Sequence, residues 1–352
     1  MKETVRAVEA FRRGKPVWIK GDARHALLAV AVETASQQAV TRLGRRYKSP
    51  FLVLSHARAR TLKIRLYTED VVALRPPLPL HVERLRAIAD PTADLAEPFK
   101  GPFETVRAPL DESFPAAVKL AKLAGLLPAA LVFPLGVRLS KAAAVTAEMI
   151  SRFDREAVQS LAIVTRARVP LAGVEHAELV AFRSEGGPEH YAVVMGSPPT
   201  DRPVLARLHS ECFTGDLLGS LKCDCGSQLR GAIKAIAETG GGVLLYLAQE
   251  GRGIGLVNKL RAYRLQDQGF DTIEANERLG FEPDERLYAV AARMLTLLGH
   301  KSVRLLTNNP AKVGALAAEG ISVVERVPHA FPDNVHNRGY LRTKAEKAGH
   351  LF

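Results

Sequence analysis

The chain has 352 residues, of which 47% are hydrophobic and 24% are charged, a profile typical of a globular protein with room for two domains. The sequence has no uncharged apolar run of about 18 residues, which excludes a membrane-spanning helix. Its charged amino terminus, MKETVRAVEAFRRGK, lacks the apolar segment of a secretory signal. We therefore expect a cytoplasmic protein without a membrane partner.

The formal net charge of +12 is concentrated in the first half of the chain. Residues 1–160 contain 26 Lys and Arg against 16 Asp and Glu, whereas residues 161–352 contain 23 against 21. A basic half is compatible with nucleic acid, an anionic small molecule, an acidic partner or a merely solubilising surface. Charge alone does not distinguish among these.

The first half combines predicted strands, PVWI and PFLVLS, with a predicted helix, AVKLAKLAGLL. Proline-rich connections, RPPLPL and ADPTADLAEPFKGP, separate them. Near residue 160 the pattern changes to a strand, LAIVTRARVPL, and a hairpin, HAELVAFRS with HYAVVMG. We therefore predict a domain boundary there, giving domains 1–160 and 161–352.

The second half alternates strands with helices, which is typical of an α/β or α+β domain. The strands are PVLARLHS, GVLLYLAQ and SVRLLTNN; the helices are CGSQLRGAIKAIAETG, LVNKLRAYRLQDQG, DERLYAVAARMLTLLG and AKVGALAAEG. The predicted fold class is thus α/β (α+β), with two mixed domains.

Three cysteines, Cys212, Cys223 and Cys225, are the sharpest chemical signal in the sequence. An odd number argues against a disulfide framework. Three protein thiolates with an open fourth position are typical of catalytic zinc, which lowers the pKa of a bound water to about 7. Two alternatives remain: a structural zinc site completed by His209, and three buried, unligated thiols.

Two strand-to-helix turns could hold an anion. In QEGRGIG, residues 249–255, glycines allow close approach to backbone N–H groups, and Arg252 offers a guanidinium suited to phosphate. A plain tight turn is the alternative. The second turn runs from Thr307 to Lys312; its alternative is a capped helix with a surface lysine.

Five motifs in order over residues 161–352 resemble GTP cyclohydrolase II: RLHSECFTGDLLGSLKCDCGSQL, QEGRGIGLVNKLRAY, LGFEPDERLY, RLLTNNPAKV and YLRTKAEKAGHL. The resemblance implies zinc-dependent hydrolysis of GTP to 2,5-diamino-6-ribosylamino-4(3H)-pyrimidinone 5′-phosphate, formate and pyrophosphate, the first step of riboflavin biosynthesis. It also implies a homodimer with one Zn²⁺ per subunit and Mg²⁺ on the triphosphate. Nucleic acid is not expected as a partner.

The resemblance also implies roles for individual residues. Cys212, Cys223 and Cys225 would bind zinc. The implied GTP-binding residues are Arg207, Leu208, His209, Ser210, Glu211, Gln228, Glu250, Gly251, Arg252, Thr272, Thr307 and Lys312.

Three further residues would be catalytic. Asp284 corresponds to a proton acceptor, with a helix cap as the alternative. Arg286 corresponds to a proposed nucleophile toward the α-phosphorus, but a guanidinium stays protonated, which favours a phosphate clamp. Tyr263 corresponds to a tyrosine associated with the second hydrolysis and hence with formate release; simple core packing is the alternative.

The first half resembles a remote 3,4-dihydroxy-2-butanone 4-phosphate synthase through AVEAFRRGKPVWI and AAVKLAKLAGLLPAALV. That family's acidic loop is reduced to KGDARHALLAVAVE, in which Asp22 is the only carboxylate before Glu33. Ser113-Phe114-Pro115 replace a His-Thr-Glu motif. Because Mg²⁺ needs hard oxygen ligands, we expect an inactive domain that serves dimerisation, stability or regulation.

Three rival interpretations remain. One is a family member that acts in pyrimidine catabolism or stops at a formamide product. The others are a nucleotide- or nucleic-acid-binding regulator and a purely structural zinc protein. The complete motif set and Tyr263 favour the full reaction.

Overall fold

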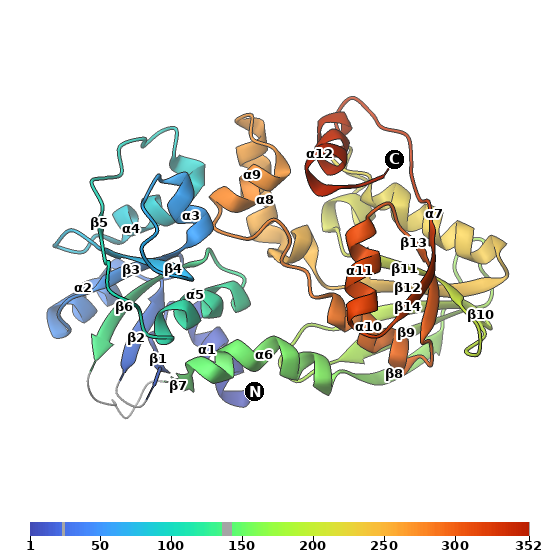
Figure 1. Ribbon diagram of the computed structural model, residues 1–352, viewed down its shortest axis with the longest axis horizontal. Helices are drawn as coiled ribbons and strands as arrows, with labels where there is room; N and C mark the ends of the chain where they lie inside the picture. Colours follow the sequence, from blue (N-terminus) through green and yellow to red (C-terminus); the bar gives the residue numbers. More distant parts are fainter. Residues whose placement is uncertain (23–24, 136–142, 352) are drawn as a thin grey trace. The chain divides into compact units, whose positions relative to one another are not determined.

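The computed structural model describes residues 1–22, 25–135 and 143–351, and the chain forms two compact mixed α/β units (Figure 1). The first unit consists of Met1–Asp154 and Val257–Asp284; the second consists of Arg155–Leu256 and Glu285–Phe352. The predicted fold class is confirmed. The boundary near residue 160 stays a prediction. Within the described ranges, no helix is long and apolar enough to cross a bilayer.

The first unit is built on a seven-stranded sheet in the order β5-β4-β3-β6-β2-β1-β7. Its strands are β1 (Val17–Lys20), β2 (Ala26–Ala31), β3 (Phe51–Ser55), β4 (Val71–Arg75), β5 (Glu104–Thr105), β6 (Ala129–Leu135) and β7 (Ala143–Thr146). β1 and β7 are parallel, and the other neighbouring pairs are antiparallel.

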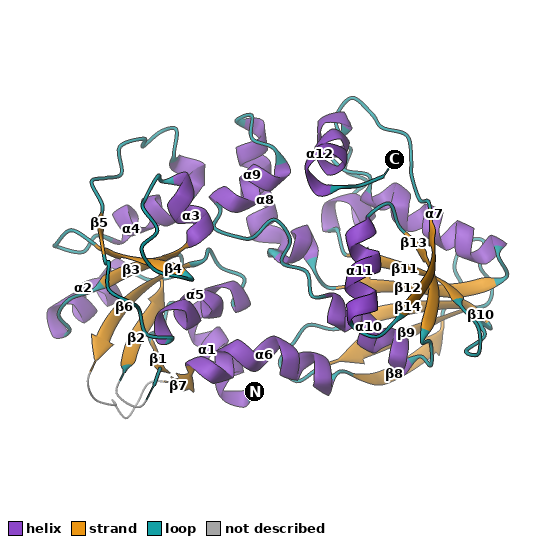
Figure 2. Cartoon of the chain, in the orientation of Figure 1, coloured by secondary structure: helices purple, strands orange, loops and turns teal. Residues whose placement is uncertain are grey.

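Helices cover this sheet (Figure 2). They are α1 (Lys2–Arg12), α2 (Gln37–Arg46), α3 (His56–Thr61), α4 (Val82–Ala89), the short η1 (Pro91–Ala93) and α5 (Ser113–Leu123). Helix α9 (Thr272–Arg278) belongs to the same unit and packs against α3. Helices α6 (Ala147–Ser160) and α8 (Gly255–Asp267) each begin in one unit and end in the other. Side chains alternate along β2, so that Leu27, Ala29 and Ala31 share a core with apolar residues of α1 and α5.

The second unit contains a seven-stranded sheet in the order β14-β13-β11-β12-β10-β9-β8. Its strands are β8 (Ala162–Arg168), β9 (Ala177–Arg183), β10 (His190–Gly196), β11 (Val204–Ser210), β12 (Gly241–Leu247), β13 (Ser302–Leu306) and β14 (Ser322–Val327). Neighbouring strands in the run β14-β13-β11-β12 are parallel. The remaining pairs, β12 with β10, β10 with β9 and β9 with β8, are antiparallel.

Helices pack on both faces of the second sheet. Its helical elements are η2 (Phe213–Leu217), α7 (Cys225–Glu238), η3 (Glu250–Gly253), α10 (Tyr288–Leu297), α11 (Pro310–Ala318) and α12 (Arg338–Ala348). Along β11, Ala206 and Leu208 face a core shared with α10 and α11, whereas Leu205 faces a core shared with α7. Strand alternation therefore directs Arg207 toward the α7 face.

One helix prediction needs correction, and one helix was not predicted. The segment DERLYAVAARMLTLLG becomes helical only at Tyr288, because the backbone N–H of Glu285 donates to the carbonyl of Arg252 at 3.0 Å and keeps this stretch extended. Helix α9 was not predicted. It begins with a capping box in which the Asp271 side chain accepts from the N–H of Glu274, and the Glu274 side chain accepts from the N–H of Asp271.

Candidate functional site

The topology of the second sheet brings three sequence motifs to one edge. Strands β11, β12 and β13 are parallel neighbours, so their carboxyl ends lie on the same side of the sheet. Glu211 and Cys212 follow β11, the EGRG turn follows β12, and Thr307 follows β13. Ligands of open α/β sheets bind outside the carboxyl ends of such strands. This edge is therefore the candidate site.

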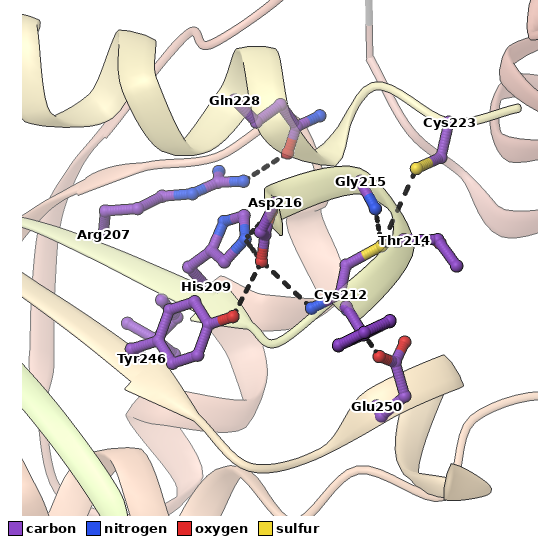
Figure 3. Close-up of polar contacts among 12 residues, drawn as sticks. Arg207, His209, Cys212, Thr214, Gly215, Asp216, Cys223, Gln228, Tyr246 and Glu250 are labelled. Atoms are coloured by element: carbon purple, nitrogen blue, oxygen red, sulfur yellow. Dashed lines mark hydrogen bonds and ion pairs between the residues drawn. The ribbon is translucent and has the colours of Figure 1, made fainter. Parts of the chain in front are cut away.

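The three cysteine thiols converge at this edge, and Figure 3 shows two of them, those of Cys212 and Cys223. The sulfur atoms of Cys212, Cys223 and Cys225 all lie within 4.8 Å of one another, and none forms a disulfide. The Sγ atoms of Cys212 and Cys223 are 3.7 Å apart. A tetrahedral zinc ion with Zn–S bonds of about 2.3 Å places its sulfur ligands about 3.8 Å apart. The cluster thus has the spacing of a zinc site.

Gly215 has no side chain and so leaves room for the thiols. It lies in the π-helical turn η2, and its N–H donates to the Cys212 sulfur at 3.3 Å. A Cβ atom at this position would lie 2.8 Å from the Cys223 sulfur and 3.0 Å from the Cys212 sulfur. Only glycine fits here without displacing the cluster.

His209 does not join the cysteines. Within the described part of the chain, the candidate ligand group holds the three thiols and not His209. Its Nε2 atom lies 3.0 Å from both carboxylate oxygens of Asp216, and its ring stacks on Tyr246 with centroids 5.6 Å apart. Asp216 also accepts from the Tyr246 hydroxyl and from the N–H of Cys212, each at 3.0 Å. The structure therefore gives no support to a Cys₃His site.

The electrostatics of the thiols depend on their crowding. Hydrogen bonding with Cys212, together with burial, raises the pKa of Cys223 to about 11. Hydrogen bonds from Cys212 and Cys223, with burial, also raise the pKa of Cys225. Three neighbouring thiolates repel one another, which favours the protonated thiols, whereas a bound cation favours the thiolates.

Arg207 and Leu208 contribute in different ways. The Arg207 guanidinium is buried, donates to the carbonyl of Leu306 at 2.9 Å and donates to the side-chain oxygen of Gln228. Desolvation lowers its pKa to about 10, so it remains a cation at neutral pH. The Leu208 side chain lies in the core, but its carbonyl accepts from the Lys312 ammonium at 3.0 Å. Position 208 therefore contributes its backbone.

The EGRG turn is held by hydrogen bonds of the Glu250 side chain and has a strained backbone. Glu250 accepts from the N–H of Phe213 at 2.7 Å and from that of Gly251 at 3.1 Å, which ties the turn to the cysteine loop. Gly251 and Arg252 are both left-handed, with φ of 63° and 64°. A Cβ at Gly253 would lie 2.8 Å from the backbone of Glu285. Such strain in a non-glycine residue is often found at ligand sites.

Four cations surround the carboxyl-terminal end of the chain. The pKa of His350 falls to about 3, first because of burial and then because of the charges of Lys344, Arg252, Lys312 and Arg286. Thr307 begins the adjacent turn, and its hydroxyl accepts from the N–H of Asn309 at 3.0 Å. Lys312 is buried, so the surface-lysine alternative is wrong. The region is therefore a candidate for binding an anion.

Three predicted site residues lie in the first unit. Tyr263 is half-buried on α8, with the Lys259 ammonium 5.7 Å from its ring centre. Thr272 begins α9 and accepts from the Gln266 amide at 3.2 Å. Asp284 is exposed. The helix-cap alternative for Asp284 is wrong, because α10 has Leu287 at its N-cap and no side-chain capping bond. Arg286 lies in the second unit, 5.4 Å from the Tyr288 ring centre.

Several residues of the second unit's site were not predicted from the sequence. Asp216 and Tyr246 hold His209 and the cysteine loop, and Lys344 reaches Asp224 between two of the cysteines. Asp216 could have been noticed as a carboxylate inside the cysteine motif. Lys344 lies in the quoted motif YLRTKAEKAGHL, to which no role was given.

The first unit has its own small polar cluster. Asp22, His25 and Asp111 bring ligand atoms within 4.8 Å of one another. Asp111 was missed because it lies 89 residues from Asp22. Its carboxylate accepts from the backbone N–H of Ser113 at 3.0 Å, and Asp22 pairs with His25 at 2.6 Å. These hydrogen bonds explain why the three side chains lie together: they link two neighbouring loops.

The second unit thus holds a metal-ligand cluster beside an anion-attracting edge. A family model described as GTP cyclohydrolase II matches residues 162–328. The GTP cyclohydrolase-2 of Azospirillum brasilense is 51% identical over 367 aligned residues, which cover 100% of this chain and 94% of that protein. The chain belongs to the GTP cyclohydrolase II family and is a hydrolase.

Other relatives match about half of this chain. The GTP cyclohydrolase-2 of Pseudomonas syringae is 56% identical over 54% of this chain and 92% of its own length. That of Actinobacillus succinogenes is 61% identical over 47% of this chain and 76% of its own. A solved two-domain 3,4-dihydroxy-2-butanone 4-phosphate synthase from A. baumannii covers 93% of this chain and 99% of its own, at 20% identity and a TM-score of 0.34. That similarity is too low to indicate a shared fold.

Proposed function

We propose that this protein is a zinc-dependent GTP cyclohydrolase II that opens the purine ring of GTP. The products are 2,5-diamino-6-ribosylamino-4(3H)-pyrimidinone 5′-phosphate, formate and pyrophosphate, which begin riboflavin biosynthesis. The observation that carries the proposal is the convergence of Cys212, Cys223 and Cys225 at the carboxyl edge of parallel strands. Membership of the GTP cyclohydrolase II family indicates that the nucleotide is GTP.

The thiol cluster supports zinc as the metal. Three soft thiolate ligands at tetrahedral spacing, with Gly215 leaving room around them, match the preference of zinc. Zinc held there would supply a water activated for hydrolysis of the purine ring. Among the described residues the group comprises three protein ligands, so a zinc ion held there would have a fourth position for this chemistry.

The cations of the second unit suit the triphosphate. Two guanidinium groups lie at this edge, those of Arg252 and Arg286, and two further cations, Lys312 and Arg207, are buried. Mg²⁺ would accompany the phosphates. Arg286 would act as a clamp that stabilises charge at the α-phosphate, because its guanidinium has no free lone pair.

The remaining roles follow the family resemblance. Asp284 would accept a proton, and its side chain is exposed. Tyr263 would support the second hydrolysis, which releases formate. Leu208, His209, Ser210, Glu211, Gln228, Glu250, Gly251, Thr272 and Thr307 complete the proposed nucleotide-binding set.

The test is incubation of purified, zinc-loaded protein with GTP and Mg²⁺, with products followed by mass. A diaminopyrimidine nucleotide together with formate and pyrophosphate supports the proposal. A formylated product would show that the second hydrolysis is lost and that Tyr263 does not support it. Absence of turnover with zinc bound would refute GTP as substrate. A Cys212→Ser variant serves as the inactive control.

We further propose that residues 1–160 form a catalytically inactive, synthase-like domain in a cytoplasmic homodimer. The Asp22, His25 and Asp111 cluster is engaged in backbone and side-chain bonds, and the His-Thr-Glu motif is missing. Ribulose 5-phosphate with Mg²⁺, in the absence of GTP, should give no formate. Sedimentation analysis tests the dimer, and clear formate release contradicts the inactive domain.

A further inference from the structure

The carboxyl-terminal helix α12 directs a buried lysine at the cysteine loop. The Lys344 ammonium lies 2.8 Å from the Asp224 carboxylate, and their side chains are only 10% and 4% exposed. Asp224 stands between Cys223 and Cys225 in the chain. Because both members of this ion pair are withdrawn from water, the bond holds the loop between the two cysteines firmly.

A chain of side-chain hydrogen bonds continues from Asp224 to Arg207. The second oxygen of Asp224 accepts from the Gln228 amide nitrogen, and the Gln228 oxygen accepts from the Arg207 guanidinium. A side-chain amide has one donating end and one accepting end. Asp224 therefore fixes which end of Gln228 faces Arg207.

Lys344 has two further contacts that fix helix α12. Its ammonium lies 4.4 Å from the centre of the Tyr340 ring, one turn earlier on the helix. Its carbonyl accepts from the N–H of His350 at 3.0 Å, which anchors the carboxyl-terminal end of the helix. Next, the N–H of Leu351 donates to the carbonyl of Asn308 at 2.8 Å. The terminal segment thus connects the cysteine loop with the turn that follows β13.

We infer that Lys344 is a positioning residue for the metal and nucleotide site. It acts through Asp224 on the loop between Cys223 and Cys225, and through Gln228 on Arg207. This inference rests on the proposed function for its effect on turnover, but not for its effect on metal retention. The motif YLRTKAEKAGHL thereby gains a physical role: it closes the polar network that shapes the site.

The test compares Lys344→Met with Lys347→Met in the full-length protein. Lys347 lies on the same helix and is exposed, so its variant controls for the loss of a lysine. Zinc loss to a chromophoric chelator and kcat/KM for GTP are measured for both. We expect Lys344→Met to lose zinc faster and to lower kcat/KM by about 10- to 100-fold, the usual effect of removing a residue that orients metal ligands.

Two further variants identify the path of the effect. Lys344→Arg keeps the cation and should recover part of the zinc retention. Asp224→Asn should resemble Lys344→Met, and the double variant should be no worse than the poorer single variant, because Lys344 acts on the site through Asp224. Should Lys344→Met fail to fold, Lys344→Gln takes its place, since it keeps a donor without the charge.

The outcomes separate this inference from the proposed function. A wild-type protein that retains zinc but does not hydrolyse GTP refutes the proposed function, while chelator competition still tests the inference. Zinc loss and kcat/KM in folded Lys344→Met equal to those of Lys347→Met overturn the inference. Additive effects of Lys344→Met and Asp224→Asn also overturn it.

Discussion

The side chains of Arg261 and Glu33 form an ion pair at 2.9 Å inside the first unit, although 228 positions separate them in the sequence. Glu33 also accepts from the backbone N–H of Leu127 at 2.8 Å. One turn earlier on α8, Asn258 donates to the carbonyl of Gly125 at 3.2 Å. Helix α8 is thereby fastened to the first unit, although it lies within the matched family region.

Breaking this ion pair should destabilise the first unit. Both side chains are only 18% exposed, and Arg261 keeps a second carboxylate partner, Asp90, at 3.4 Å. Glu33→Gln should therefore lower the free energy of unfolding by about 1–3 kcal/mol, the cost of losing hydrogen bonds to a buried charged group. Urea unfolding measures the change. The exposed pair Glu9–Arg13 provides the control, and Glu9→Gln should cost less than about 0.5 kcal/mol. Equal effects of the two substitutions would refute a special role for Glu33.

The sequence predicted local chemistry better than long-range packing. Strand and helix patterns predicted most elements of the second unit, and cysteine spacing predicted the convergence of the three thiols. Asp216 and Lys344 were missed because their partners, Tyr246 and Asp224, are 30 and 120 positions away. No local pattern reveals such pairs.

The packing of residues 257–284 also escaped prediction for a physical reason. Helix α8 buries the polar residues Asn258 and Lys259 together with Ala262 and Leu265, so its sequence has no continuous apolar face that would indicate which core receives it. Gly280 shows how closely the segment packs: a Cβ there would lie 2.8 Å from the Ser55 hydroxyl and 3.3 Å from the Arg58 Cβ. This contact joins residues distant in sequence, so only the fold reveals it.

Gly215→Ala should weaken metal binding. The added Cβ would lie 2.8 Å and 3.0 Å from the sulfur atoms of Cys223 and Cys212, so the thiols must spread beyond tetrahedral spacing. We expect zinc affinity to fall by about 10-fold or more, as when ligand orientation is disturbed. Competition with a chromophoric chelator measures it.

Gly314→Ala is the matched control for Gly215→Ala. Gly314 lies within helix α11, and a Cβ there would meet nothing within 4 Å. Alanine should therefore stabilise the helix slightly, by about 0.5–1 kcal/mol, without any change in zinc affinity. Undiminished zinc binding by Gly215→Ala would show that the glycine is not needed for space.

Arg252 combines backbone strain with a predicted role in binding, and two substitutions separate these. Its φ of 64° is left-handed, which glycine adopts at no steric cost and alanine does not. Arg252→Gly should therefore be more stable than Arg252→Ala by about 1 kcal/mol. Both lose the guanidinium, so both should raise KM for GTP. Thermal unfolding and steady-state kinetics test the two effects; a nucleotide affinity restored by glycine would refute the phosphate role.

His190 should make the second unit sensitive to acid. Burial lowers its pKa from 6.5 to about 4, and its Nδ1 atom accepts from the N–H of Ala248 at 3.1 Å, which requires a neutral Nδ1. Between these pKa values the unfolded chain binds the proton and the folded chain does not, so stability falls as the pH drops from 6.5 to 4. The full shift corresponds to about 3 kcal/mol.

The His190→Asn variant tests this pH dependence. Its side-chain oxygen can accept from Ala248 and does not titrate, so the variant should lose less stability than the wild type between pH 6.5 and pH 4. Urea unfolding across this range gives the difference in slope, which removes the contribution of other titrating groups. His176→Asn, at an exposed position, should keep the wild-type slope. Parallel curves for wild type and His190→Asn would mean that His190 is already protonated, or readily becomes so, in the folded protein.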